Sequence, residues 1–125
     1  MARLGPLFFC PMIFDPKYPI FLFHQFVDMR KGHNTLAHIV SHVMALDLLS
    51  GALFLFVGKN RKAVKAIFFD GNGLLLIHKK LERGKFMSFE NLMEVTEINS
   101  NELTLILNGG QIPLSKTGKK ITLKI

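Results

Sequence analysis

The sequence is short of cysteine, tryptophan and acidic residues, and two of these shortages exclude classes of chemistry. Its single cysteine, Cys10, cannot form an internal disulfide and has no second cysteine with which to build a zinc or redox pair. The nine Asp and Glu residues are scattered, whereas metal-dependent catalysis needs clustered carboxylates. A Walker-type phosphate loop is also absent. We therefore predict a protein that is not an enzyme and that uses no metal and no cofactor.

Long hydrophobic runs are absent too. Residues 4–14, LGPLFFCPMIF, form an apolar stretch, but it is far too short to span a membrane, and Pro6 and Pro11 interrupt any helix there. We expect residues 1–18 to be an irregular leader, residues 19–112 to form one domain and residues 113–125 to be a basic tail. The lone cysteine and the missing membrane segment predict a cytoplasmic location.

Positive charge is plentiful, and it is concentrated. The formal net charge is +7, and residues 59–85 alone carry +6, because eight basic side chains there face only Asp70 and Glu82. A focused positive field attracts polyanions, of which nucleic acid is the commonest. The alternative is a solvated basic surface that only aids solubility.

Apolar patterning predicts an α+β fold with a mainly antiparallel sheet of four or five strands, one principal helix and a short C-terminal helix. The sequence Asp70-Gly71-Asn72-Gly73 is typical of a tight hairpin turn and places Phe69 opposite Leu74 and Lys65 opposite His78. Residues 91–98 are ambiguous. The expected strands are 19–27, 52–58, 63–69 and 74–80, with 86–89 as a candidate fifth.

The principal helix is expected over residues 34–47, capped by Asn34 or Thr35. Its apolar face would consist of Leu36, Ile39, Val40 and Val43. His38 and His42 fall on the opposite side, and we interpret them as exposed residues rather than metal ligands, because no third ligand is near. A short helix, residues 102–108, is expected after the cap Asn99-Ser100-Asn101 and should end at Gly109-Gly110.

The segment Asp28-Met29-Arg30-Lys31-Gly32 connects the first expected strand to this helix. Arg30 and Lys31 suit phosphate binding, helped by the helix N-terminus just beyond them. A structural role is the alternative, in which Asp28 pairs with Arg30 and Gly32 supplies a positive φ. Phe86 could stack on a base, but a place in the core is favoured. The predicted nucleic-acid-binding residues are Arg30, Lys31, Lys59, Arg61, Lys62, Lys65, Lys79, Lys80, Arg83 and Lys85.

Three ordered strings, DMRKG, SGALFLF and KAIFFDGNGLLLIHKKLERGKF, resemble the TnpB-type, Orf2-like accessory protein of the insertion-sequence sixty-six transposon family. The resemblance covers roughly residues 19–112. It implies a bacterial, non-catalytic protein that is encoded beside a much larger transposase and is needed for transposition. The matched motif positions include Asp28, Met29, Gly32, Asp70, Gly73, Glu82 and Gly84.

The sequence departs from the family pattern at three places. The helix start, usually Phe-Asp-Gly-Leu, here reads His33-Asn34-Thr35-Leu36. Phe68-Phe69 stand where a Trp usually precedes the Asp, and Lys79-Lys80 replace the usual Lys-Arg. Two hypotheses follow from the residues and the resemblance together. One is a DNA-binding accessory factor that uses the basic hairpin and the Arg30-Lys31 corner; the other is an adaptor that docks on the transposase. Regulation through RNA is a third, weaker one, and the residues favour no particular oligomeric state.

Overall fold

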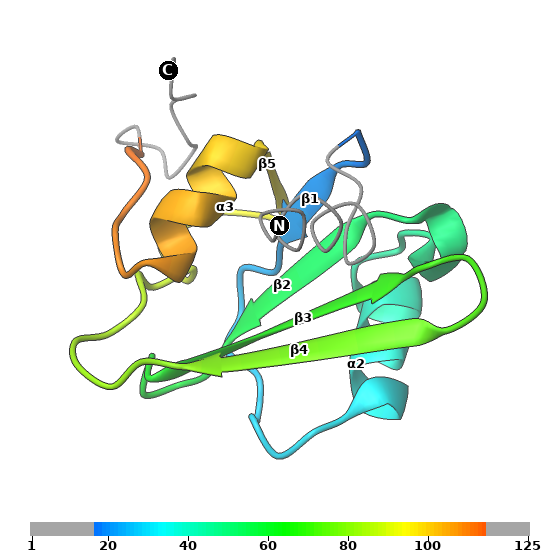
Figure 1. Ribbon diagram of the computed structural model, residues 1–125, viewed down its shortest axis with the longest axis horizontal. Coiled ribbons are helices and arrows are strands. Elements are labelled where there is room, and N and C mark those ends of the chain that lie inside the picture. Colours follow the sequence, from blue (N-terminus) through cyan, green and yellow to red (C-terminus); the bar gives the residue numbers. More distant parts are fainter. Residues whose placement is uncertain (1–16, 115–125) are drawn as a thin grey trace, which may run out of the picture.

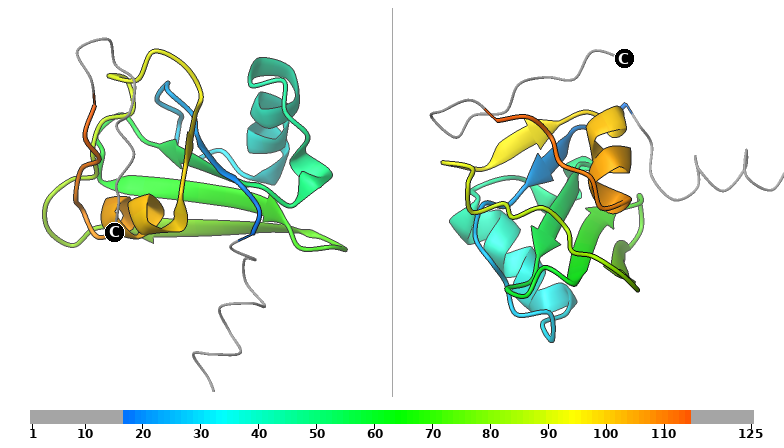
Figure 2. Two further views of the ribbon diagram at one scale, coloured as in Figure 1. Left: turned by 90° about the horizontal axis from the view of Figure 1, so that it is seen from above. Right: turned by 90° about the vertical axis from the view of Figure 1, so that its left-hand side faces the viewer.

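The computed structural model describes residues 17–114, which form a twisted five-stranded sheet with helices on both faces (Figures 1 and 2). The strand order is β4-β3-β2-β1-β5. Most of the expected leader and basic tail lies outside the described residues. The strands are β1 (Ile20–Leu22), β2 (Leu53–Val57), β3 (Ala63–Phe69), β4 (Leu74–Lys80) and β5 (Thr96–Ile98). The helices are α2 (His33–His38), the π-helix η1 (Ile39–Val43), the 3-10 helix η2 (Leu48–Ser50) and α3 (Ser100–Leu107).

Three of the four strand pairings are antiparallel, so the predicted α+β fold with a mainly antiparallel sheet is confirmed. The remaining pair, β1 with β2, is parallel, and the chain between these strands passes through α2, η1 and η2. This parallel pair is not predicted by the sequence. The reason is that β1 has only three residues, too few for a strong period-2 pattern.

The β3–β4 hairpin has the predicted register. Phe69 pairs with Leu74 and Lys65 pairs with His78. The turn is stabilised by Asp70, whose Oδ1 accepts hydrogen bonds from the backbone N–H groups of Asn72 (3.2 Å) and Gly73 (3.0 Å). Gly71 has a φ of +113°, which other residues adopt only with strain. Asp70 and Gly73 are therefore turn-forming residues.

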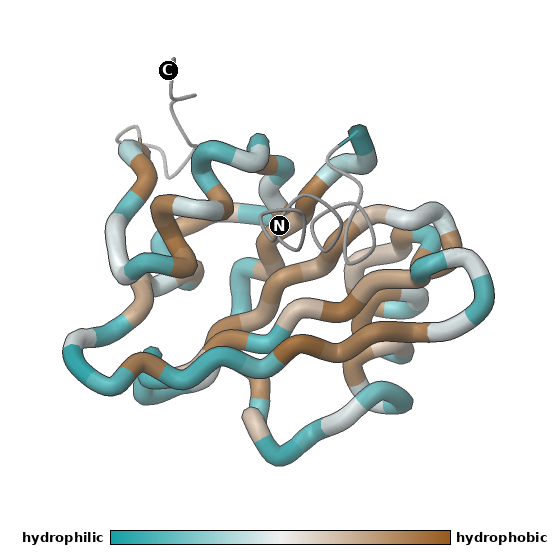
Figure 3. The backbone as a smooth tube through the Cα atoms, in the orientation of Figure 1, coloured by the Kyte–Doolittle hydropathy of each residue, from teal (hydrophilic) through white to brown (hydrophobic). Residues whose placement is uncertain are grey.

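The sheet separates two apolar cores. Phe54, Phe56 and Ile67 point to one face, where they pack with Leu36 and Val40 of the helix that follows β1. The alternate residues of the same strands point to the other face, against α3 and the long connection after β4. β2 is therefore buried along its whole length, and its sequence is apolar at every position (Figure 3).

The principal helix differs from the prediction at both ends. It runs from His33 to Val43 instead of 34–47, and its N-cap is Gly32 with no side-chain cap, so the predicted Asn34 or Thr35 cap is wrong. Its second half is a π-helix in which Met44 N–H bonds to Ile39 C=O (2.8 Å). The wider turn shifts the facing of later residues: Met44 is buried, whereas Val43, expected in the apolar face, is 56% exposed.

The remaining differences concern strand lengths. The strand expected over 19–27 ends at Leu22, although Val27 forms an isolated bridge with Gly58. Residues 86–89 form no strand; Phe86 and Phe89 instead fill the core from an irregular connection. The ambiguous segment 91–98 contains β5.

The C-terminal helix is capped within the predicted segment, but it begins at Ser100, two residues earlier than expected. Asn99 caps α3 by accepting a hydrogen bond from Glu102 N–H (2.8 Å), while the buried Glu102 carboxylate accepts from Asn99 N–H (2.9 Å). This reciprocal arrangement is a capping box, here with Asn as the cap. The helix ends before Gly109, which has a φ of +88°. None of the helices within residues 17–114 has the length and apolarity needed to cross a membrane.

Candidate nucleic-acid interface

Three segments that are distant in the sequence meet at one end of the sheet. They are the connection after β1 (residues 26–31), the β2–β3 turn (58–62) and the loop after β4 (80–86). Val27 bridges Gly58, which joins the first two. Backbone hydrogen bonds from Phe86 N–H to Arg61 C=O (2.7 Å) and from Leu81 N–H to Lys62 C=O (2.9 Å) join the last two. We call this region the basic end.

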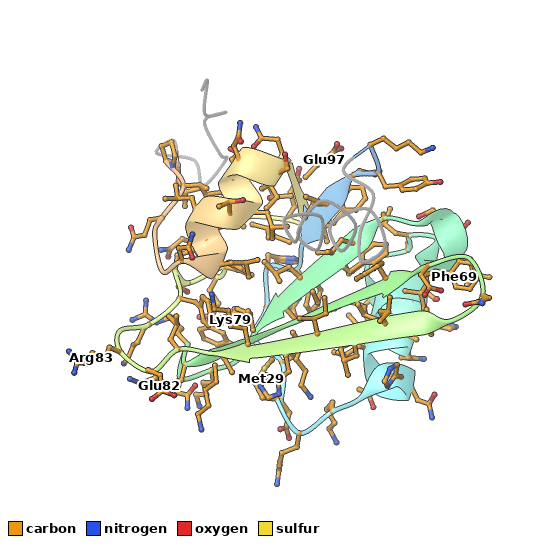
Figure 4. All side chains as sticks on the ribbon, in the orientation of Figure 1. Met29, Phe69, Lys79, Glu82, Arg83 and Glu97 are labelled. Carbon is orange, nitrogen blue, oxygen red and sulfur yellow. The ribbon has the colours of Figure 1, made fainter. Side chains whose placement is uncertain are left out.

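The basic end holds most of the net charge of the protein. Its eight basic side chains face two acidic ones, Asp28 and Glu82, so it carries +6 of the formal +7. Most of these side chains are exposed, and Arg83 and Glu82 lie in the loop that projects beyond β4 (Figure 4). The basic side chains are Arg30, Lys31, Lys59, Arg61, Lys62, Lys80, Arg83 and Lys85. The structure thus brings the Arg30-Lys31 corner and the basic hairpin to the same end of the sheet.

Asp28 and Arg30 form a bidentate ion pair. Arg30 Nη2 donates to Asp28 Oδ2 (2.7 Å), Arg30 Nε donates to Oδ1 (3.0 Å), and the Arg30 backbone N–H donates to the same Oδ1 (2.9 Å). The hydrogen bonds from Arg30 hold the pKa of Asp28 well below its usual range, and Asp28 raises the pKa of Arg30 in return. The Arg30 side chain is 89% exposed. Because one edge of its guanidinium lies against the Asp28 carboxylate, the plane of the guanidinium has a defined orientation.

The structural alternative for the DMRKG segment is correct for Asp28 but wrong for Gly32. Gly32 has a φ of −110°, which any residue adopts, and a Cβ there would meet nothing within 4 Å. A glycine that sequence reasoning did not single out, Gly58, has a clear packing role. A Cβ at Gly58 would lie 2.7 Å from Met29 Cγ. The absence of a side chain at Gly58 is therefore what lets the motif residue Met29 lie against the β2–β3 turn.

Two of the lysines predicted to bind nucleic acid donate hydrogen bonds to the backbone of the protein itself. Lys65 is only 7% exposed, and its Nζ donates to Lys31 C=O (2.6 Å), holding the motif segment against β3. Lys79 Nζ donates to Leu107 C=O (2.7 Å) at the C-terminus of α3 (Figure 4). A cation at this position satisfies a helix-end carbonyl and complements the negative end of the helix dipole. Both ammonium groups are thereby directed at the protein's own backbone.

The loop after β4 has its own backbone requirement. Gly84 has a φ of +79°, so this motif position needs a glycine, and Lys62 Nζ donates to its carbonyl (3.3 Å). Phe86 is completely buried, as favoured, and it anchors the loop from the core side. The exposed Arg83 and Lys85 therefore stand on a loop that is fixed at its end by Phe86.

An open pocket lies next to the Asp28–Arg30 pair. It has a volume of about 750 Å³. Apolar groups of Phe26, Val27 and Met29 contribute to its lining together with Gly58. Sequence reasoning missed Phe26, Gly58 and Asn60, because each acquires its place only through the Val27–Gly58 bridge. The lining residues are Phe26, Val27, Asp28, Met29, Arg30, Gly58, Lys59 and Asn60.

Two other features lie outside the basic end. Asp70 and Gly73 form the hairpin turn at the opposite end of β3 and β4, so the structure does not bring them to the other motif residues. His38 and His42 are exposed as expected, and their rings stack with centroids 4.2 Å apart. Within residues 17–114, no three His, Cys, Asp or Glu side chains are grouped closely enough to hold a metal ion.

The fold and the basic end define a small α+β protein with a polarised positive surface. The chain belongs to the IS66 Orf2-like family, the accessory proteins of that insertion sequence, because the family model described as "IS66 Orf2 like protein" matches residues 18–117. The family is one of generally non-catalytic transposition proteins. The resemblance drawn from the motifs is thereby confirmed.

The curated relatives carry no assigned function. "Uncharacterized protein y4hO" of Sinorhizobium fredii is 37% identical over 82 residues, which cover 66% of this chain and 71% of that protein. "Uncharacterized protein y4jC" of the same species is 38% identical over 63 residues, which cover 50% of this chain and 54% of that protein. No solved structure matches this chain significantly.

Proposed function

We propose that this accessory protein binds DNA through the basic end, without catalysing a reaction, and acts in the cytoplasm. The observation that supports this proposal is the meeting of three separate segments in one surface of net charge +6. A surface of this kind neutralises phosphates and releases the counterions condensed on DNA. Phosphate contacts give affinity and orientation but no direct sequence reading, so the basic end by itself predicts binding to any duplex.

The residues proposed for phosphate contact are fewer than the sequence indicated. Lys65 and Lys79 are left out, because their ammonium groups make short, part-buried hydrogen bonds (2.6 and 2.7 Å) to backbone carbonyls of the protein. Lys62 is kept, because its bond to Gly84 C=O is longer (3.3 Å) and exposed. Glu82 is surrounded in sequence by basic residues and lowers the local charge only slightly. The proposed contacts are Arg30, Lys31, Lys59, Arg61, Lys62, Lys80, Arg83 and Lys85.

The test is fluorescence-anisotropy binding to duplexes carrying the terminal repeats of the element and to scrambled duplexes, at low and at physiological salt. We expect affinity that falls steeply with salt. The triple variant Lys59→Gln, Lys80→Gln, Arg83→Gln should lower the salt slope by about 2–3, because each lost phosphate contact removes nearly one released counterion.

The matched control is Lys17→Gln, which removes one exposed positive charge at the start of β1, the end of the sheet remote from the basic end. It should leave the salt slope unchanged. Absence of binding to any duplex at low salt would contradict the proposal. The second hypothesis, an adaptor whose basic end meets an acidic surface of the transposase, would then be tested by pull-down with the transposase.

A further inference from the structure

The pocket beside the Asp28–Arg30 pair combines two chemistries that a phosphate-binding surface does not need together. Phe26, Val27 and Met29 supply apolar lining, while Arg30 and Lys59 bring cations to the same pocket. Phosphate contacts need only the cations. An apolar floor beside cations fits a flat, weakly polar group that is attached to an anionic backbone.

We propose that this pocket accepts an unpaired nucleobase, so that the basic end binds single-stranded or frayed DNA in preference to uninterrupted duplex. This inference rests on the proposed function and specifies its ligand. Bases in an intact duplex are stacked on their neighbours and must be unstacked before a protein can enclose them. Proteins that bind single strands combine a positive groove for the backbone with apolar or aromatic contacts for the bases.

The geometry of the pocket favours a base held at its floor and phosphates held at its rim. Met29 packs closely against Gly58, where a Cβ would lie 2.7 Å from its Cγ, and this packing places its apolar side chain in the lining of the pocket. At the rim, Asp28 holds one edge of the Arg30 guanidinium, and the remaining N–H donors of a side chain that is 89% exposed stay available for a phosphate oxygen. The pocket, about 750 Å³ in volume, is open to solvent rather than enclosed, so a base that is still attached to a strand can reach it.

Lys65 and the β2–β3 turn keep this arrangement in place. Lys65 Nζ donates a hydrogen bond to Lys31 C=O (2.6 Å), which holds the Asp28–Gly32 segment against β3. Asn60 Oδ1 accepts from Lys62 N–H (3.0 Å), which fixes the facing turn. A pocket between two braced segments loses little conformational entropy when a base enters it.

The experiment compares a single-stranded oligonucleotide with an abasic oligonucleotide of the same length, using the full chain. The two strands carry equal backbone charge, so their difference reports contacts to bases alone. We expect the ordinary strand to bind about tenfold more tightly, the size of one base-stacking contact. Equal affinities for the two strands would overturn the inference while leaving the proposed function intact. Failure of the proposed function is a different result, the absence of salt-sensitive binding to duplex and strands alike.

The variant Met29→Gln keeps the length of the side chain and makes the pocket floor polar. It should bring the affinity for the ordinary strand down to that for the abasic strand, with the abasic affinity unchanged. Met93→Gln, at a methionine that is 69% exposed and does not line the pocket, is the matched control and should keep the tenfold preference. A preference that survives Met29→Gln would place the base outside this pocket and overturn the assignment.

A spectroscopic measurement on the wild-type protein is independent of whether the variant folds. A single-stranded oligonucleotide containing one 2-aminopurine should change its fluorescence on binding, because the base moves from the strand stack into an apolar pocket. The same probe in a duplex should respond much less. Binding that leaves the fluorescence of the single strand unaltered would mean that only phosphates are contacted, and the inference would be wrong.

Discussion

At the scale of single residues, Asp28 shows how an exposed charge can be both paired and oriented. Its carboxylate accepts four hydrogen bonds from Arg30 at 2.7–3.2 Å. An exposed ion pair adds little to the stability of a protein, so its main effect is on the direction of the Arg30 side chain. The sequence alone did not decide whether Asp28 and Arg30 pair, because side chains two residues apart meet only when the backbone between them turns.

The first prediction concerns the titration of Asp28. Its pKa is lowered by the hydrogen bonds from Arg30, so it should stay ionised in acid that protonates an ordinary Asp, whose pKa is about 3.9. A group with a lowered folded-state pKa contributes stability above its unfolded pKa and loses that contribution as the pH falls through the folded value. The carboxyl carbon shift of Asp28, followed by NMR between neutral pH and strong acid, measures this.

The control for this titration is Arg30→Ala, in which the Asp28 midpoint should return close to the ordinary Asp value. A midpoint near 3.9 in the wild-type protein would show that the ion pair does not persist in solution.

At the scale of elements, two neighbouring lysines of β4 have separate roles. The Nζ of Lys79 bonds to the last turn of α3, whereas Lys80 is exposed at the basic end. Successive side chains of a strand point to opposite faces, and α3 covers only the face on which Lys79 lies. The sequence alone offers no reason to assign Lys79 and Lys80 different roles, because it does not show where α3 packs.

The second prediction separates these roles. Lys79→Met should lower the free energy of unfolding by about 1–2 kcal/mol, since Leu107 C=O loses a charged donor, and should leave DNA affinity almost unchanged. Lys80→Met should weaken DNA binding and change the free energy of unfolding by less than about 0.5 kcal/mol. Urea unfolding and anisotropy binding of both variants provide the measurements. An unfolding free energy that is unaffected by Lys79→Met would refute the capping role.

At the scale of the whole molecule, the charge within residues 17–114 is strongly polarised: the basic end carries +6, and the remaining described residues together carry −3. Like charges gathered on one surface repel each other, and this repulsion opposes the compact state unless salt or a polyanion screens it. Binding and stability are therefore expected to respond to salt in opposite directions: DNA affinity falls, while the free protein becomes more stable.

The third prediction follows from this polarity. Raising the sodium chloride concentration from low to physiological values should raise the Tm of the free protein by about 2–4 °C, on the order of 0.5 kcal/mol for a domain of this size. The Lys59→Gln, Lys80→Gln, Arg83→Gln variant should show a smaller rise, because three of the repelling charges are gone. Calorimetry at matched pH measures both. Equal rises in the two proteins would mean that the charges of the basic end do not repel appreciably.

The sequence by itself determined the features that depend on near neighbours. The β3–β4 register follows from a turn whose Asp and Gly residues specify its geometry, and the start of α3 follows from Asn99 and Glu102, three residues apart. The family also follows from motifs that are contiguous strings. Hydrogen bonds between residues two to four positions apart require particular residue types at a fixed spacing. Such features can therefore be recognised in the sequence.

Only the tertiary structure decided which basic residues share a surface. The Val27–Gly58 bridge and the parallel β1–β2 pair bring Arg30 beside Lys59, and the pocket exists only because of that meeting. The same packing directs the ammonium groups of Lys65 and Lys79 to backbone carbonyls of the protein, with which they form hydrogen bonds. Contacts across more than twenty residues depend on the free energy of burying both faces of the sheet at once. That free energy is a property of the assembled core and leaves no pattern at any fixed spacing along the chain.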